Sequence, residues 1–344
     1  MELPESLRAA LEDELSSLAP KRVAALTAAL SQRYRSAASN LATSTGSSFV
    51  PSPGDVAAYA AYRIPATFAA VAAVLKEVRE RLPGWEPRSL LDAGAGPGTV
   101  AWAAAAVWPG LAKATLVERE SGMIALGRRL AARAASDLVR DATWLQVDLT
   151  GSWPDVSPHD LVVLSYVLGE IQPGRAEALV NQLWEMTGGA LILVEPGTQS
   201  GHARIRQARE WLAGAVIGAT VVGATVIAPC PHGGPCPMGA DDWCHFAQRV
   251  ARSRLHRQAK GGELSYEDEK FSYVAVSRPG LPAAPVRARV LRHPQVRSGH
   301  IRLELCSATG GLTSEIVTRK DRERFKEARD LRWGSGIQWS EAGW

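Results

Sequence analysis

Residues 90–98 read Leu90-Leu91-Asp92-Ala93-Gly94-Ala95-Gly96-Pro97-Gly98, and they decide the fold of this 344-residue chain. The apolar residues before Asp92 predict a buried strand, and the alanine-rich stretch from Thr99 to Val107 predicts a helix. Glycines between a strand and a helix let the backbone turn sharply and approach a ligand closely. The free N–H groups at the start of the helix then point at that ligand. The stretch therefore predicts a nucleotide-binding turn in an α/β fold.

The same alternation of strand and helix continues beyond this turn. The predicted strands cover 114–118, 143–148, 160–165 and 190–196, and the predicted helices cover 123–135, 176–186 and 202–215. Strands that alternate with helices pair in a parallel, doubly wound sheet with helices on both faces. Residues 271–276 and 300–306 alternate between apolar and polar side chains, and we expect them to add the last two strands of that sheet.

Carboxylates accompany three consecutive predicted strands. Asp92 precedes the glycines, Glu118 ends the second strand and Asp148 ends the third. A doubly wound sheet binds its ligand at the carboxyl ends of its strands, so we expect these acids to face one site. The candidate ligand-binding residues are Asp92, Gly94, Gly96, Gly98, Glu118 and Asp148. The spacing Gly-x-Gly-x-Gly differs from the G-x-G-x-x-G of nicotinamide-dependent enzymes, which are the alternative.

This combination resembles motif I of the class I methyltransferases, which have a Rossmann-like doubly wound sheet. The resemblance implies that the turn holds the methionine part of S-adenosylmethionine, that Glu118 accepts both ribose hydroxyls and that Asp148 binds the adenine amine. Catalytic residues stay unassigned, because residues 165–170 lack the Asn/Asp-Pro-Pro-aromatic motif of amino-methylating enzymes. No cysteine nucleophile for carbon-5 of cytosine lies near them either. Tyr166 and Glu170 either contact a substrate or are structural.

The four cysteines, Cys230, Cys236, Cys244 and Cys306, form a second candidate site. The first two lie in a proline- and glycine-rich loop, and an intracellular protein rarely pairs four cysteines as two disulfides. Four thiolates suit either tetrahedral zinc or a 4Fe–4S cluster. Structural zinc sites usually contain closely spaced cysteine pairs, and the wider spacing here favours the cluster. Zinc and unligated thiols are the alternatives.

Positive charge gathers in the C-terminal part of the chain. Residues 1–248 carry 20 Lys/Arg against 24 Asp/Glu, whereas residues 249–344 carry 19 against 11. A basic region on a near-neutral body indicates a polyanionic partner such as RNA, and ordinary surface charge is the alternative. We predict a basic helix over 246–260. Its candidate RNA-binding side chains are Arg249, Arg252, Arg254, Arg257 and Lys260, to which Arg287, Arg289, Arg292 and Arg297 would add.

Several stretches together resemble the methyltransferase-like small-ribosomal-subunit family, whose mitochondrial members belong to or assemble the mitochondrial small subunit. These stretches are 30–35, 58–59 with 63–67, the turn, 242–246 with the cysteine loop, 253–257, 271–274 and 332–334. The resemblance implies a 4Fe–4S cluster on the four cysteines and S-adenosylmethionine at the turn. It also implies binding to small-subunit rRNA while the small ribosomal subunit is assembled, and thereby a role in translation. It leaves methyl transfer open. An active rRNA methyltransferase is the second hypothesis, and a small-molecule methyltransferase with structural zinc is the third.

The organisation expected from these patterns has five parts. They are an N-terminal helical region (1–80), an S-adenosylmethionine-binding core (81–228), an inserted cysteine loop with a basic helix (229–262), the final strands of the core (263–310) and a basic tail (311–344). The start of the chain resembles no targeting leader, which favours a bacterial, cytoplasmic member of the family. The apolar stretch 213–228 is too short to span a membrane, and we expect a buried helix followed by a strand-like segment there. We also expect a monomer without membrane contact.

Overall fold

A computed structural model describes residues 2–16, 19–39, 52–214, 216–217, 220–221, 223–239, 241–252 and 265–338 of the chain. The strands of the main sheet lie in the order β3-β2-β1-β4-β5-β10-β8, and β9 pairs with β10. Its members are β1 (Ser89–Ala93), β2 (Lys113–Glu118), β3 (Thr143–Gln146), β4 (His159–Ser165), β5 (Thr187–Pro196), β8 (Thr225–Ala228), β9 (Phe246–Ala251) and β10 (Tyr266–Ser277).

The first five strands pair in parallel, as the alternation of strand and helix predicts. Strand β10 then runs antiparallel to β5, and β8 runs antiparallel to β10. The strand order reverses at β1, which pairs with β2 on one side and β4 on the other. A ligand site is expected at such a switch point, outside the carboxyl ends of the strands.

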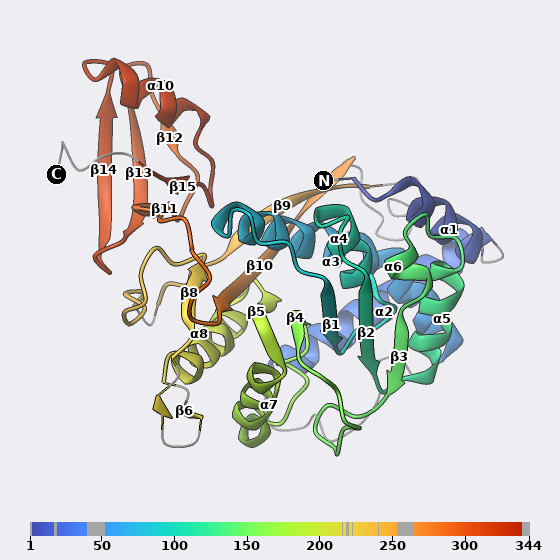
Figure 1. Cartoon of the computed structure of the whole chain (residues 1–344). Helices are drawn as coiled ribbons and strands as arrows, with labels where there is room; N and C mark the ends of the chain where they lie inside the picture. The colour runs from blue at the N-terminus through green and yellow to red at the C-terminus, as the bar shows by residue number, and fades with distance from the viewer. Residues whose placement is uncertain are drawn as a thin grey trace.

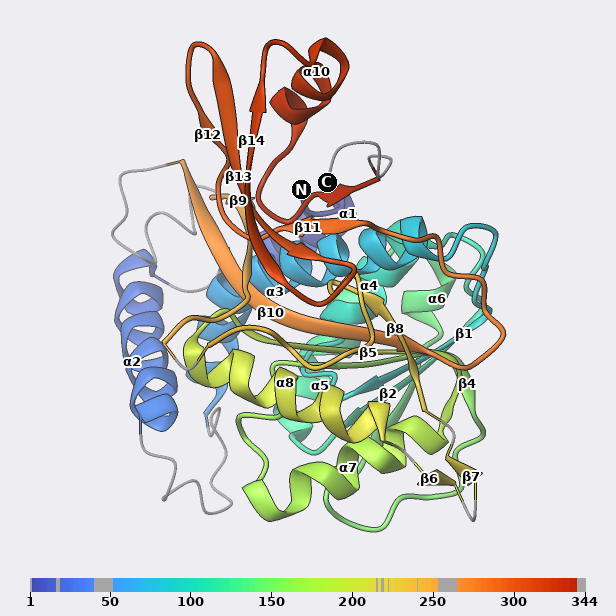
Figure 2. The ribbon, with the colours of Figure 1, turned by 90° about the vertical axis from the view of Figure 1, so that its left-hand side faces the viewer.

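Helices cover both faces of the main sheet (Figure 2). On one face, side chains such as Leu90 and Val163 pack with the long helix α3 and with α4; on the other, Leu91 and Val162 pack with α7 and α8. Successive strand residues point to opposite faces, so strands that are buried on both sides need unbroken apolar runs. The helices are α1 (Glu5–Ser16), α2 (Pro20–Ser39), α3 (Pro53–Arg81), α4 (Thr99–Val107), α5 (Ser121–Ala131), α6 (Asp137–Arg140), α7 (Pro173–Glu185) and α8 (Gln199–Ala213).

Helix α3 forms the centre of the predicted N-terminal helical region. Within the described part of the chain, its residues Gly54–Arg81 are the one stretch long and apolar enough to cross a membrane, and 78% of the most apolar window is buried in the protein. This helix therefore acts as a core element. Helix α2 ends at Ser39, and residues 40–51 lie outside the described residues.

A second, smaller sheet forms a C-terminal module, residues 288–337, which stands off the main body in Figure 1. Strand β13 was expected in the main sheet, and this is wrong, because it lies in the middle of the module. The apolar side chains that alternate along β13 face α10, so they fit a strand buried on one face only. The module comprises β11 (Ala288–Val290), β12 (Gln295–Val296), β13 (His300–Ser307), β14 (Leu312–Thr318), α10 (Arg322–Asp330) and β15 (Gly336–Ile337).

Two other expectations are corrected. The basic helix over 246–260 is wrong in its first half, because these residues form β9 beside β10, and residues 253–264 lie outside the described residues. Phe246 and Val250 are both buried, and a spacing of four fits a helix and a strand equally well. The stretch 213–228 contains no helix beyond the end of α8; it forms β6 (Val216–Ile217), β7 (Thr220–Val221) and β8 in its described residues.

Candidate functional site

The glycine turn after β1 adopts a backbone that favours glycine. Gly94, Gly96 and Gly98 have φ angles of 69°, 53° and 80°. A Cβ on Gly94 would lie 2.5 Å from Cγ2 of Val167. The amides of Gly94 and Ala95 donate to the carbonyl of Val117 at 2.8 and 2.9 Å, which fixes the turn to β2. The turn is thus a rigid cradle at the switch point of the sheet.

Glu118, at the end of β2, is bound to the backbone around the turn. Its Oε2 accepts the amide of Gly96 at 2.8 Å, and its Oε1 accepts the amides of Arg119 and Glu120, each at 2.9 Å. Burial raises the pKa of this carboxyl, and the three amides partly oppose that rise. A carboxylate has about four lone-pair sites, so Glu118 retains capacity for a ligand hydroxyl.

Asp92 lies beneath the turn and is fully buried. Neither of its carboxyl oxygens has a hydrogen-bond partner among the described residues. Burial, and then the charge of Glu118, raise the pKa of Asp92 well above its ordinary value. An unpartnered buried carboxyl is costly, and such a group indicates either a proton or a positively charged ligand nearby.

Four of the six predicted ligand residues border one cavity of about 550 Å³, which we call the turn cavity; Asp92 is not part of its lining. Gly94, Gly96, Glu118 and Asp148 line it, whereas Gly98 caps the start of α4. Asp148 lies just past β3 with 52% of its side chain exposed, and it accepts hydrogen bonds from the Thr150 amide and hydroxyl at 2.8 and 2.7 Å. These two bonds lower the pKa of Asp148.

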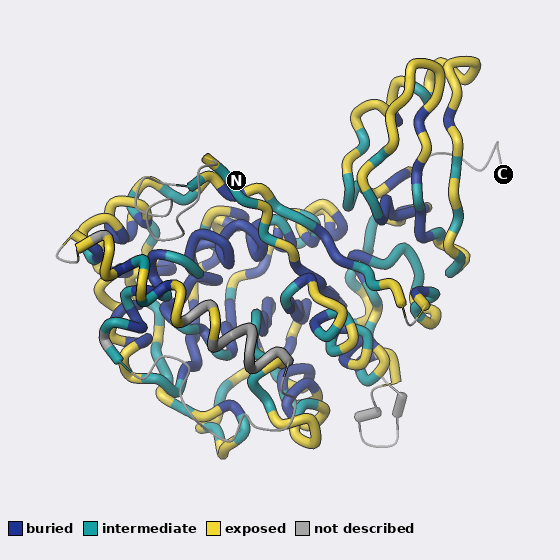
Figure 3. The backbone as a smooth tube through the Cα atoms, turned by 180° about the vertical axis from the view of Figure 1, so that it is seen from behind, coloured by how far each residue is buried: buried dark blue, intermediate teal, exposed yellow. Residues whose placement is uncertain are grey.

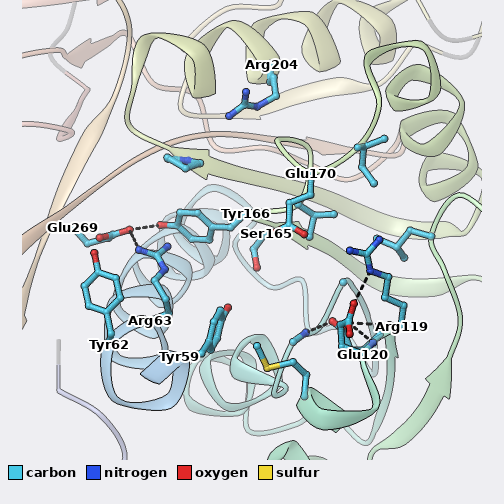
Figure 4. A pocket seen from close by; sticks show the side chains of 18 of the residues that line it. Tyr59, Tyr62, Arg63, Arg119, Glu120, Ser165, Tyr166, Glu170, Arg204 and Glu269 are labelled. Carbon is cyan, nitrogen blue, oxygen red and sulfur yellow. Dashed lines mark hydrogen bonds and ion pairs between the residues drawn. The ribbon is translucent and has the colours of Figure 1, made fainter. Parts of the chain in front are cut away.

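On the opposite wall of the turn cavity, the sequence had raised only Tyr166 and Glu170 as substrate contacts (Figure 4). The Arg63 guanidinium on α3 lies 4.9 Å from the centre of the Tyr166 ring and 3.4 Å from Oε1 of Glu269. The Tyr166 hydroxyl donates to the same Oε1 at 3.1 Å. Tyr166 is the one non-glycine residue with a positive φ, 60°, in the described chain. Positions 59, 62 and 63 share a helix face, but they lie far in sequence from the glycine turn, so only the fold brings the two walls together.

Three polar side chains in this cavity have unused hydrogen-bonding capacity. The hydroxyls of Tyr59 and Ser165 and the carboxyl of Glu170 make no hydrogen bond to another described residue. Burial raises the pKa of Glu170 to about 8, and burial raises that of Tyr59 to about 12. Glu170 is therefore mostly protonated at neutral pH and offers a ligand a donor as well as an acceptor.

All four cysteines border a second, smaller cavity, the cysteine cavity, and none forms a disulfide. Cys306 comes from β13 of the module, while the other three come from the loop before β9. The Cys306 Sγ lies 3.5 Å from Nε2 of His232. Among the described residues no three potential ligands lie close enough to hold a single ion, so the structure itself does not show the expected metal-cluster insertion.

Burial and the charges of neighbouring cysteines raise the pKa of the Cys230, Cys244 and Cys306 thiols. Burial raises the pKa of Cys306 to about 12 and that of Cys244 well above its ordinary value, and the charges of the other cysteines add to both shifts. Burial also raises the pKa of Cys230. Since only the thiolate is a good metal ligand, this cavity needs a bound cation or cluster to hold its cysteines ionised.

Two buried arginines shape the cysteine cavity. Arg289 donates to the carbonyls of Pro229 and Gly334, both at 2.8 Å, and to Oε1 of Glu77 at 2.5 Å. Arg209 donates to the carbonyls of the loop residues His232 and Gly234. Arg289 is only 1% exposed, so the expectation that it adds to an RNA surface is wrong. It joins the main body to the module instead.

The two cavities share elements of the main sheet. Asp268, Glu269 and Lys270 of β10 border the turn cavity, and Ser272 and Tyr273 of the same strand border the cysteine cavity. A hydrogen bond also links residues beside the two cavities. The indole Nε1 of Trp243, next to Cys244, donates at 3.0 Å to the carbonyl of Gly197, which borders the turn cavity.

Of the predicted RNA-binding residues that the structure describes, Arg249, Arg252 and Arg292 are paired with acids, whereas Arg297 is exposed and forms no ion pair with a described residue. Arg249 lies 3.0 Å from Asp268, and Arg252 lies 2.9 Å from Glu267. Arg254, Arg257 and Lys260 lie outside the described residues.

The strand order, the antiparallel β10 between β5 and β8, and the glycine turn with acids after β2 and β3 define a class I methyltransferase-like fold. The chain belongs to the family described as mitochondrial small ribosomal subunit Rsm22, whose family model matches residues 53–338. This finding confirms the family resemblance of the sequence.

Two curated relatives are mitochondrial proteins. The human ribosome assembly protein METTL17 is 30% identical over 286 residues, which cover 80% of this chain and 61% of that protein. The Rsm22-cox11 tandem protein 2 of Schizosaccharomyces pombe is 24% identical over 326 residues, which cover 81% of this chain and 42% of that protein. The chain thus spans less than two thirds of the length of either relative.

Solved methyltransferase structures are more distant. A putative RNA methyltransferase from Pyrococcus horikoshii has a TM-score of 0.38 and 12% identity, over 61% of this chain and 84% of that one. Magnesium protoporphyrin IX methyltransferase from Synechocystis, with bound SAM, has a TM-score of 0.37 and 14% identity, over 80% of this chain and 98% of that one. The fold assignment rests on the strand order and the turn.

Proposed function

We propose that this chain assists assembly of the small ribosomal subunit by binding its RNA, as an S-adenosylmethionine-binding, iron–sulfur-containing protein with a methyltransferase fold. The observation that carries the proposal is the extent of the family match, because residues 53–338 include the walls of both cavities. The name of the human relative supports it, since that protein is a ribosome assembly protein.

The assembly role is tested by deleting the gene and separating ribosomal subunits on a sucrose gradient. We expect fewer mature small subunits and more precursor small-subunit RNA, with large subunits unchanged at first. Restoration by the wild-type gene is the control. A normal ratio of subunits in the deletion strain would contradict the assembly role.

S-adenosylmethionine fits the lining of the turn cavity. The unpartnered carboxyl of Asp92 lies below the turn, where a cation seated above would offset its charge. Glu118 has lone pairs left for ribose hydroxyls, and Asp148 places an acceptor at the rim for an adenine amine. When bound, S-adenosylmethionine supplies a methyl group on a positively charged sulfur.

The cofactor assignment is tested by Asp92→Asn. The amide keeps the shape of the side chain but removes its charge, so we expect S-adenosylmethionine to bind about tenfold more weakly, about 1.4 kcal/mol. Calorimetric titration measures this affinity. Asp141→Asn, at an exposed position, is the matched control and should bind like wild type. If the Asp92 variant bound S-adenosylmethionine as tightly as wild type, Asp92 would not contribute to the binding site.

An iron–sulfur cluster fits the cysteine cavity better than zinc does. The four thiols border one cavity, yet no three potential ligands are close enough for a single ion in the described residues. Zinc holds its sulfurs about 2.3 Å away, which brings them close together, whereas a four-iron cube keeps its cysteines farther apart. Cys230, Cys236, Cys244 and Cys306 would hold the cluster, and Arg209 and Arg289 would keep their loop in shape.

Purification without oxygen tests this assignment. We expect a brown protein with visible sulfur-to-iron absorption and with iron and sulfide in equal amounts. Exposure to air should bleach it. A colourless protein that contains zinc would contradict the cluster and support the zinc alternative.

Methyl transfer to ribosomal RNA is the second candidate function. It is favoured by the free side chains of Tyr59, Ser165 and Glu170, which border the cavity beside the turn. Such groups could orient an acceptor in line with a methyl group, and positioning alone supplies much of the rate in transfers of this kind. Methylation of small-subunit RNA should be mapped in strains with and without the gene. Identical maps would retire the enzyme hypothesis for this RNA.

A further inference from the structure

Five basic side chains gather at the far end of the C-terminal module. Two turns meet there: the connection between β12 and β13, and the connection between β14 and α10. The Arg297 amide donates to the His300 carbonyl at 2.9 Å, and the Arg319 amide donates to the Gly299 carbonyl at 3.2 Å. The five side chains are all exposed, and we call them the basic tip: Arg297, His300, Arg319, Lys320 and Arg322.

The positive charge of the basic tip is not compensated. None of its side chains forms an ion pair with a described residue. The one acid in the two turns is Asp321, whose Oδ1 accepts the amide of Arg324 at 3.1 Å and whose Oδ2 lies 3.8 Å from Nε of Arg324. Asp321 therefore caps α10 and pairs with a residue of that helix. The cations beside it remain available to a partner.

Other basic side chains of the C-terminal third, unlike those of the tip, are paired with or interspersed among acids. Arg249 and Arg252 on and after β9 pair with acids of β10, and Arg302 on β13 pairs with Glu304 at 3.0 Å. Along α10 the cations alternate with Glu323, Glu327 and Asp330. Excess positive charge in the described part of this third is thus greatest at the tip.

Apolar side chains beside the tip are exposed as well. Val296 is 61% and Ile316 is 58% exposed, and together with Leu312 they are the large exposed hydrophobic residues of the described chain. All three lie on the module, whose surface is mostly exposed in Figure 3. In Figure 1, β14 ends at the side of the module far from the main sheet, so a large partner can reach the tip without meeting the main body.

We infer that the basic tip is an RNA-binding surface that contacts the phosphate backbone of small-subunit RNA. The inference rests on the proposed function and moves the main RNA contact from residues 249–260 to the tip, of which the sequence had named Arg297 as an additional contact. Cationic side chains that form no ion pair within the protein bind phosphate irrespective of base sequence, and the apolar residues beside them suit sugars and bases of an unpaired stretch. The tip therefore gives affinity and position, and it selects no sequence.

The test measures how the binding of transcribed small-subunit rRNA to the full-length protein depends on salt. The tip variant combines Arg297→Gln, Arg319→Gln, Lys320→Gln and Arg322→Gln. Each phosphate contact contributes about 0.7 to 0.9 to the slope of log affinity against log salt. We expect the slope to become shallower by about 3 and the affinity at physiological salt to fall about tenfold or more.

A matched control removes four exposed cations of the main body instead: Lys76→Gln, Arg88→Gln, Lys113→Gln and Arg128→Gln. It has the same net charge as the tip variant and should keep nearly the wild-type slope. A second variant with Lys in place of Arg297, Arg319 and Arg322 should keep the slope too, because phosphate responds to charge. Thermal melting verifies that all variants fold.

The outcomes are separable. If wild type binds no small-subunit RNA, the proposed function fails. If wild type binds but the tip variant keeps its slope, or the control loses as much as the tip variant, the inference is overturned and the proposed function stands. Loss of binding to small-subunit proteins with unchanged binding to naked RNA would also overturn it, in favour of an acidic protein partner.

Discussion

The turn cavity and the cysteine cavity lie on the same strand, β10, but they are built in different ways. The turn cavity is formed by the ends of regular strands and the rigid glycine turn, whose amides are bonded to β2. The cysteine cavity is formed by a loop, by β13 of the module and by two buried arginines. The backbone of the first is fixed by hydrogen bonds within the main sheet, whereas the second contains thiols whose charges repel one another once ionised.

Because the two cavities are built differently, we expect a ligand to add unequally to the free energy of unfolding at each. A ligand of the turn cavity fills space that the sheet already encloses, so its loss should leave the fold intact. A cluster in the cysteine cavity would join the loop to the module, and its loss should weaken both. Binding to the folded state always stabilises it, but the effect is largest where the site does not exist in the unfolded chain.

The largest effect is expected from Cys244→Ser, because the Cys244 thiol interacts with the other three cysteines. We expect loss of the visible absorption and a fall in the free energy of unfolding of about 4 kcal/mol or more. Metal analysis and chemical denaturation measure the two. Met238→Leu, a thioether that borders the same cavity, is the control and should retain the metal. A fully stable, metal-free Ser variant would show that the cysteine cavity is as self-sufficient as the turn cavity.

Gly94→Ala should have the next largest effect. Its φ of 69° and the 2.5 Å approach of Val167 leave no room for a methyl group. We expect a loss of about 2–3 kcal/mol in the free energy of unfolding and loss of S-adenosylmethionine binding, with the metal content unchanged. Gly174→Ala is the control, since nothing lies within 4 Å of a Cβ there. If the glycine variant bound the cofactor normally, the turn would not be the binding element.

Glu170→Gln tests how a buried carboxyl of the turn cavity makes the stability of the protein depend on pH. Burial raises the pKa of Glu170 from 4.5 to about 8, so the folded protein keeps a proton that the unfolded chain releases. Wild-type stability should therefore fall as the pH rises from about 4.5 to 8 and level off above 8, by at most about 1.4 kcal/mol per pH unit. The variant should lack the share of this slope that Glu170 contributes, so its stability should fall less steeply over the same range. Melting curves across the pH range measure the difference, and parallel curves for the two proteins would contradict the raised pKa.

The smallest effect is expected from Trp243→Phe, which removes the bond to the Gly197 carbonyl between the cavities. One hydrogen bond of this kind contributes about 1 kcal/mol to stability. We expect that loss in chemical denaturation, with the metal retained. Trp153→Phe, which removes a similar indole bond to the Leu149 carbonyl, is the control for the loss of one indole bond elsewhere in the chain. A change in metal content on Trp243→Phe alone would mean that the cavities depend on each other.

The sequence predicted the main sheet and one wall of its site. Strands β4 and β5 carry unbroken apolar runs, and the acids after β2 and β3 stand at strand ends, so local pattern and position in the sheet agree. The pattern of β13 showed a strand but not its sheet, because the choice depends on which strand it pairs with. Arg63 and Glu269 lie 206 residues apart, and nothing local to either residue indicates that they meet.

The position of Cys306 on β13 has a consequence for the time at which each cavity can form during synthesis. The residues that border the turn cavity are all present once β10 has left the ribosome. The cysteine cavity must wait for Cys306, 62 residues after Cys244, which is about 3 to 12 s at ordinary rates of elongation. During that interval the thiols of Cys230, Cys236 and Cys244 lack the side of the cavity that β13 and Cys306 supply. The chain therefore offers a complete binding cradle at the turn before it can enclose its cysteines, and the docking of the module is the step that ends their exposure.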